Sequence, residues 1–152
     1  YQAACEVPYE MYTIPFGKAA FVREGDDVTV VAFGQMVGRA AAAIDALEAL
    51  GISCDLIDPR TSSPLDEDAI LESVEATGRL IVIDESPPRC GLTADIAGLA
   101  ADRAFHALKA PIKQVCAPHS PTPFAPELEA AYLPSVERIK ATIQQLLQAW
   151  SV

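Results

Sequence analysis

Residues 80–98 read LIVIDESPPRCGLTADIAG and hold the clearest pattern in the chain. An apolar run comes first, followed by an acidic pair, two prolines, an Arg-Cys-Gly turn and a segment with apolar residues at helical spacing. This pattern predicts a strand buried on both faces, a tight loop and then a helix. Open α/β sheets place ligands and partners at such strand-to-helix junctions. The junction is therefore the first candidate for a functional site.

Strand-like and helix-like runs alternate on both sides of this segment. The β-prone runs are 19–23, 28–33, 54–58 and 112–116, and the helical ones are 36–50, 66–76, 93–108 and 136–150. The first two β-prone runs flank a Gly/Asp turn and predict a hairpin. The alternation predicts an α/β fold: a three-layer αβα sandwich around a mostly parallel five-stranded sheet with an antiparallel edge hairpin.

Residues 1–18 differ from the rest of the chain. They mix aromatic residues, prolines and a glycine without periodicity. We expect them to form a connecting arm, followed by one domain over residues 19–152.

Composition limits the classes of partner. The chain has 152 residues, 51% of them hydrophobic, and a formal net charge of -10. Such a charge opposes non-specific binding to nucleic acid or anionic membranes and favours a basic protein partner. No apolar run approaches the length of a membrane span. The four cysteines form no CxxC pair, so we expect reduced thiols in a cytoplasmic protein.

Two turns could carry chemistry. Gly34 ends a predicted strand, but the spacing that follows fits neither a dinucleotide fingerprint nor a P-loop. Cys90 lies beside Arg89 and before a helix, and both features would activate a thiol. A phosphatase-type loop would need an arginine where Ile96 stands, and no basic partner is identifiable. A small thiol enzyme using Cys90 and a free-standing small-molecule binding module remain the alternatives.

Acidic and aromatic residues suggest contacts with other proteins. Between Arg60 and Arg79 there is no lysine or arginine, whereas Glu72 and Glu75 lie on a predicted helix with three further acids. A solvated helix face explains each acid singly, and an acidic patch that docks a basic partner explains them together. Trp150 ends the wide apolar face of the last helix and could contribute to an interface.

Six motifs recur in an order that resembles a known family. They are TIPFGKA at 13–19, IDPRT at 57–61, SPLDE at 63–67, DE at 84–85 with PRCG at 88–91, PTPFAP at 121–126 and LP at 133–134. Together they resemble the C-terminal domain of the β subunit of thiamine-diphosphate-dependent 2-oxo acid dehydrogenases. Pyruvate, branched-chain 2-oxo acid and acetoin dehydrogenases belong to this family. The run APHSP at 117–121, with His119, is most similar to acetoin and bacterial members.

The resemblance implies a transketolase C-terminal fold and a role in assembly. In that family an alpha subunit and a second β subunit complete a heterotetramer, and a basic subunit-binding domain of the lipoyl acyltransferase component docks on it. Thiamine diphosphate and magnesium are held between the alpha subunit and the N-terminal domain of the β subunit. The arm would then lead from that N-terminal domain.

Catalysis would therefore lie outside this chain, since the activating glutamate and the Gly-Asp-Gly motif of the family belong to those other parts. The resemblance implies no catalytic, cofactor-binding or metal residue here, and we expect the isolated chain to lack oxidoreductase activity. Candidate partner contacts are Glu72, Glu75, Arg89, Phe124 and Trp150.

Overall fold

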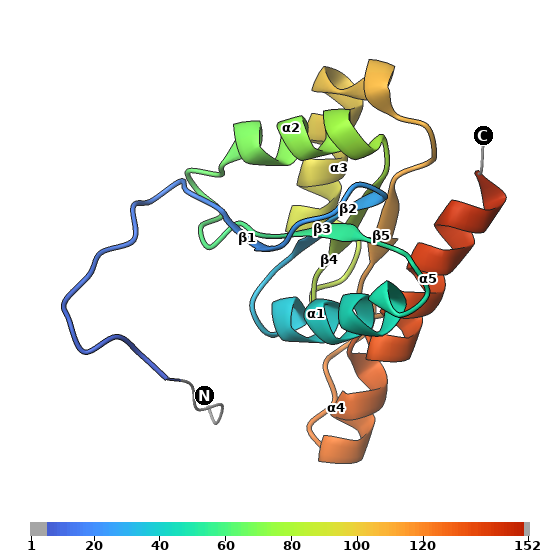
Figure 1. Cartoon of the computed structure of the whole chain (residues 1–152). Helices are drawn as coiled ribbons and strands as arrows, with labels where there is room; N and C mark the ends of the chain where they lie inside the picture. Colours follow the sequence, from blue (N-terminus) through green and yellow to red (C-terminus); the bar gives the residue numbers. More distant parts are fainter. Residues whose placement is uncertain (1–5, 151–152) are drawn as a thin grey trace.

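The computed structural model describes residues 6–150 and contains a sheet with helices on both faces (Figure 1). The strands are β1 (Ala20–Arg23), β2 (Val28–Ala32), β3 (Cys54–Asp58), β4 (Leu80–Ile83) and β5 (Lys113–Val115). The helices are α1 (Gln35–Glu48), α2 (Glu67–Thr77), α3 (Leu92–Arg103), a 3-10 turn η1 (Phe105–Ala107), α4 (Pro126–Tyr132) and α5 (Val136–Ala149).

The sheet has the strand order β1-β3-β2-β4-β5, and every neighbouring pair except β1–β3 is parallel. Side chains alternate across the central strand, so Val30 packs with α1 and α5 while Val31 packs with α2 and α3. Two apolar cores, one on each face, result from this alternation. The predicted three-layer sandwich with a mostly parallel five-stranded sheet is confirmed.

The predicted hairpin is wrong in its pairing. The edge strand β1 is antiparallel, but its partner is β3 and not β2. Both edges of β2 are taken by parallel neighbours, β3 and β4. The connection between β1 and β2 instead crosses the start of β3, where the Gly25 N–H donates to Asp55 Oδ1 at 2.9 Å. A Cβ at Gly25 would lie 2.3 Å from the Cys54 nitrogen, so only glycine fits this crossing.

Helix ends agree with the sequence except after α3. The expected helix over 93–108 ends at Arg103, and the chain continues through Ala104 (φ -120°) into η1. Ser135 caps α5, because its side chain accepts a hydrogen bond from the Arg138 N–H at 3.1 Å. Among the described residues, no helix is both long and apolar enough to cross a membrane.

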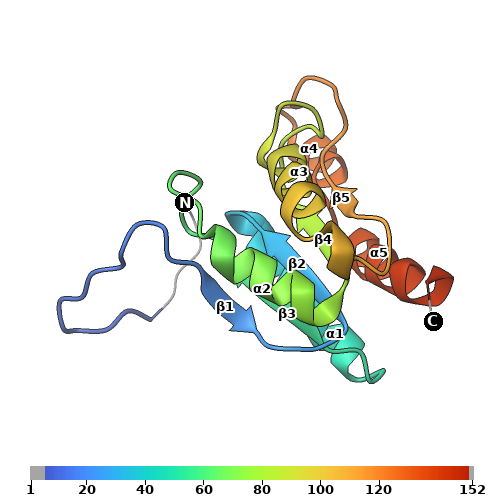
Figure 2. The ribbon, with the colours of Figure 1, turned by 90° about the horizontal axis from the view of Figure 1, so that it is seen from above.

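Residues 6–16 are exposed and extend away from the body (Figure 2). The chain is fastened to the body just beyond them. The Gly17 N–H donates to Thr61 Oγ1 and the Ala19 N–H donates to Asp66 Oδ2, both at 2.9 Å. The remaining ends of the predicted arm and domain, 1–5 and 151–152, lie outside the described residues.

Candidate functional site

The carboxyl edge of the sheet holds the junction singled out in the sequence. The loops after β2 and β4 meet there, at the point where the strand order reverses and α/β folds often bind ligands. Gly34 begins α1 with a φ of 54°, which favours glycine. The next residue, Gln35, donates from Nε2 to Glu85 Oε2 at 2.5 Å. The hydrogen bond therefore links the loops that follow β2 and β4.

The acidic pair at the end of β4 shapes the loop that follows. Asp84 is buried, its Oδ1 accepts the Glu85 N–H at 2.8 Å, and its Oδ2 accepts the Ser86 hydroxyl. Asp84 therefore hydrogen-bonds to groups of the loop that follows it. An ion pair between these acids and Arg89 is absent among the ion pairs of the described residues.

Cys90 is exposed and lines a hollow of about 650 Å³ at the start of α3. Its φ of 56° is in the left-handed region. The charged residues lining the hollow are Asp84 and Asp95, and neither histidine nor lysine is among its lining residues. A nucleophilic thiol needs a cationic or basic partner, so this geometry gives a thiol enzyme no support.

The other two described cysteines are buried and structural. Burial, together with the charges of Asp27 and Asp55, raises the pKa of the Cys54 thiol to about 12. Burial also raises the pKa of Cys116, and a hydrogen bond with Thr93 opposes that rise. Both thiols stay protonated at neutral pH, which suits packing rather than catalysis.

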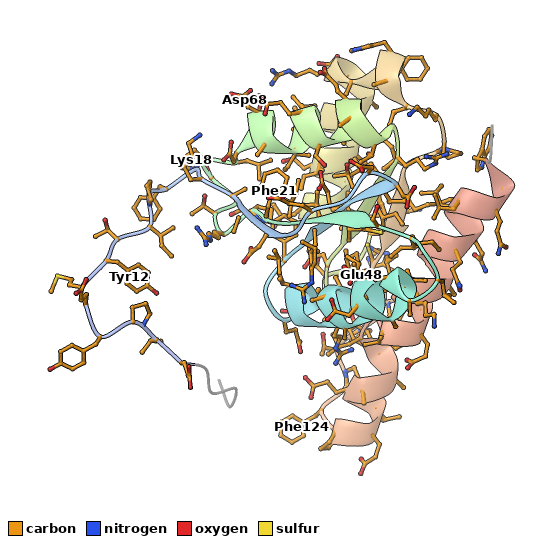
Figure 3. The ribbon with its side chains drawn as sticks, viewed as in Figure 1. Tyr12, Lys18, Phe21, Glu48, Asp68 and Phe124 are labelled. Atoms are coloured by element: carbon orange, nitrogen blue, oxygen red, sulfur yellow. The ribbon has the colours of Figure 1, made fainter. Side chains whose placement is uncertain are left out.

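The five predicted contact residues do not form one site. Glu72 and Glu75 lie exposed on α2, and Arg89 lies exposed in the β4–α3 loop. Phe124 is fully exposed near α4, at the far end of the molecule from α2 (Figure 3). Trp150 is 45% exposed at the end of α5, where its carbonyl accepts a hydrogen bond from Arg79.

The acidic surface predicted on α2 is partly neutralised. Glu67 pairs with Arg103 at 2.6 Å, and Glu75 lies 3.9 Å from the His106 Nε2. Arg103 comes from α3 and His106 from η1, which both pack against α2, so the absence of lysine and arginine between 60 and 79 did not reveal these neighbours. Asp68 and Glu72 are left as exposed acids of the patch for which the described residues show no ion pair.

Sequence reasoning missed an apolar groove at the opposite edge of the sheet from β1. We name it the Trp150 groove: a hollow of about 510 Å³ lined mainly by Phe105, Leu108, Lys109, Pro111, Ile112 and Trp150. A second hollow of about 440 Å³ adjoins it, because Trp150 lines both, and Lys113 at the start of β5 also lines this second one. The run FHALKAPI at 105–112 could have indicated the groove, because it has more apolar residues than one face of a helix can bury.

Residues 6–150 contain no group of three or more His, Cys, Asp or Glu side chains that could hold a metal ion. Cys116 and His119 both line a hollow of about 330 Å³, but burial raises the pKa of this thiol, and its side-chain hydrogen bond is with Thr93 at 3.3 Å. The chemistry of the chain therefore has to be judged from its relatives.

Comparison with known proteins gives a consistent answer. The family model for the transketolase C-terminal domain matches residues 17–139. The chain is 51% identical over 147 residues to the β subunit of acetoin:2,6-dichlorophenolindophenol oxidoreductase from Bacillus subtilis, covering 97% of this chain and 43% of that protein. It is 42% identical to the pyruvate dehydrogenase E1 component subunit beta of the same organism, covering 94% of this chain and 44% of that protein.

A solved structure supports the same fold. The split-gene transketolase described as an inactive beta4 tetramer matches with a TM-score of 0.80 and 26% identity, over 91% of this chain and 45% of that one. The chain spans less than half the length of the curated relatives and of this structure.

Proposed function

The chain belongs to the family of transketolase C-terminal domains, and we propose that it is the assembly and partner-docking domain of a dehydrogenase β subunit. The parent enzyme would be a thiamine-diphosphate-dependent acetoin or 2-oxo acid dehydrogenase of the bacterial cytoplasm. The observation that carries the proposal is the 51% identity to an acetoin oxidoreductase β subunit over 97% of this chain. The APHSP run at 117–121 supports acetoin as the substrate.

The described residues do not fit thiamine diphosphate or magnesium. They offer no cluster of metal ligands, and Gln35 and Glu85 hydrogen-bond to each other between the loops that follow β2 and β4. We therefore propose that the cofactor binds in the other parts of the parent assembly. There the substrate would be cleaved and the acyl unit passed to a lipoyl group, while this chain supplies contacts to the alpha subunit, a second β subunit and the acyltransferase component.

Charge supports docking of a basic domain on α2. The chain carries a net charge of -10, and Glu72 is exposed on α2 with Asp68 one turn before it. Charged groups at an exposed rim accelerate encounter and fix register more than they add affinity. Binding of the basic subunit-binding domain at this face would therefore weaken with added salt.

The test is a pull-down of the chain with the cognate alpha subunit and the acyltransferase component. We expect capture of both, and we expect the double variant Glu72→Lys and Glu75→Lys to lose about tenfold in affinity for the acyltransferase component. Glu127→Lys, which reverses an exposed charge on α4, is the matched control. Failure to capture either partner would refute the proposal, and turnover of acetoin or pyruvate by the chain alone would refute the expected lack of activity.

A further inference from the structure

The hollow of about 330 Å³ that Cys116 and His119 line is formed by the end of β5, the loop after it, α4 and the first turn of α5. We name it the Arg138 hollow. None of its lining residues is an aspartate or a glutamate. The two hollows beside α3, by contrast, have acidic linings, which include Glu67, Asp84, Asp95 and Asp102. A hollow with an arginine, a histidine and no acid attracts anions, even on a chain with 21 acids and 11 lysines and arginines.

Arg138 supplies the positive charge of this hollow. Its Nη1 donates to the Cys116 carbonyl at 2.8 Å, and the ion pairs of the described residues do not include it. Its Nε and Nη2 have no hydrogen-bond partner among the described residues. A guanidinium presents such N–H groups side by side, in the geometry that matches the two oxygens of a carboxylate.

Two further side chains add hydrogen-bond donors. The Thr93 hydroxyl donates to Gln114 Oε1 at 3.4 Å, which leaves the amide Nε2 of Gln114 free to donate. His119 is exposed, and its ring offers at least one N–H in either protonation state. Asp84 acts on Cys116 in the same wall, but its oxygens accept the Glu85 N–H and the Ser86 hydroxyl. The free polar groups that line the hollow are therefore mainly donors.

The rest of the wall is apolar and held in place. The Tyr132 side chain is 8% exposed, and its hydroxyl donates to the Ser120 carbonyl at 3.0 Å, so α4 fixes the loop that closes one side. α4 itself lies at the end of the molecule away from α2 (Figure 1). The small apolar lining residues are Pro88, Ala117, Pro118 and Ala131. At 330 Å³ the hollow is near the lower end of the range of about 300–1,000 Å³ for small-molecule sites.

We propose that the Arg138 hollow binds a short-chain organic carboxylate. The carboxylate group accepts hydrogen bonds from Arg138 and Gln114, and the hydrocarbon part packs against the apolar wall. Inorganic phosphate shares the negative charge but has no apolar part, so it binds more weakly. The inference goes beyond the proposed function, which gives this chain no small-molecule site. Its failure would leave the capture of protein partners in the pull-down untouched.

The test is a titration of the isotope-labelled chain at pH 7, followed by the chemical shifts of its backbone amides. The probes are butyrate, its uncharged analogue butyramide, and inorganic phosphate. We expect butyrate to give saturating shifts at residues 114–119 and 136–138, with a dissociation constant on the order of 1 mM. Butyramide and phosphate should each bind at least tenfold more weakly. Butyrate shifts that do not saturate, or phosphate binding as tight as that of butyrate, would overturn the proposal.

A charge placed in the hollow gives the sharpest variant. Gln114→Glu keeps the oxygen that Thr93 contacts and adds a negative charge beside the bound carboxylate, so butyrate binding should weaken at least tenfold. Gln148→Glu adds the same charge at an exposed position of α5 and should leave binding unchanged. Arg138→Gln removes the guanidinium and should also weaken binding at least tenfold. Equal loss in Gln114→Glu and Gln148→Glu would show only a response to net charge and would refute the site.

The apolar wall has its own variant. Ala131 is exposed on α4, so Ala131→Leu should fold and should fill part of the hollow. We expect it to weaken butyrate binding at least tenfold while every polar group of the site stays in place. Unchanged butyrate binding in this variant would contradict the proposal, because the hydrocarbon part would then lie outside the hollow.

Discussion

Two apolar runs of this chain have opposite surroundings. Strand β4 reads LIVI at 80–83 and is wholly buried, whereas the arm reads VPYEMYTIPF at 7–16 and is exposed throughout. Parallel neighbours satisfy both edges of β4, and a helix layer covers each of its faces. Pro8 and Pro15 interrupt the arm, and proline cannot donate to a sheet. An apolar run alone therefore does not show that the domain buries it. The elements that pack beside the run decide whether its side chains are covered.

The largest expected effect is a difference in unfolding free energy between a substitution in β4 and one in the arm. Ile83→Ala in β4 should cost about 2–5 kcal/mol of unfolding free energy, because the removed atoms leave a cavity between packed layers. Met11→Ala in the arm should change it by less than about 0.5 kcal/mol, since that side chain is fully exposed. Urea unfolding of the monomer at low concentration measures both. Equal losses would break the contrast, because the arm would then be packed on its own body.

The next largest effect on unfolding free energy is expected at Asp66, which holds the chain where the arm joins the body. Asp66 is 9% exposed, accepts the Ala19 N–H at 2.9 Å and lies 3.8 Å from the Lys18 Nζ. Asp66→Ala should cost about 1–3 kcal/mol, because a half-buried backbone N–H loses its acceptor. Asp68→Ala, which removes an exposed acid from the same helix end, is the control and should cost less than about 1 kcal/mol. Similar losses for the two variants would show that this fastening does not define where the body begins.

Sequence patterns predicted the interior of this fold better than its connections. The buried run at 80–83 and the cap at Ser135 follow from local rules, and both are present. The partner of β1 could not be read locally, because β3 lies 31 residues or more further along and is inserted between β1 and β2.

The candidate site shows the same limit. The acids of α2 can be located in the sequence, but Arg103 and His106, which lie beside Glu67 and Glu75, come from elements that follow in the chain. The Trp150 groove combines η1, the segment just before β5 and Trp150 after α5, so no single stretch of sequence contains its pattern. Motifs indicated the family because they are local, whereas contact surfaces are assembled from distant segments.

The smallest expected effect is on the pH dependence of stability, where the buried thiol of Cys54 and the exposed thiol of Cys90 should differ. Burial raises the pKa of Cys54 to about 12 from an ordinary 9.0, so the unfolded chain loses this proton first as the pH rises. The unfolded state then binds fewer protons, and the contribution of Cys54 to stability falls between about pH 9 and pH 12, by at most about 1.4 kcal/mol per pH unit.

Cys54→Ala should therefore flatten the alkaline loss of stability relative to the unaltered chain, even though its stability at pH 7 is lower. Cys90→Ser removes an exposed thiol and should leave the slope as it was. Urea midpoints at pH 7, 9 and 10 for the three chains decide the matter, and an unchanged slope in Cys54→Ala would mean that water reaches the start of β3.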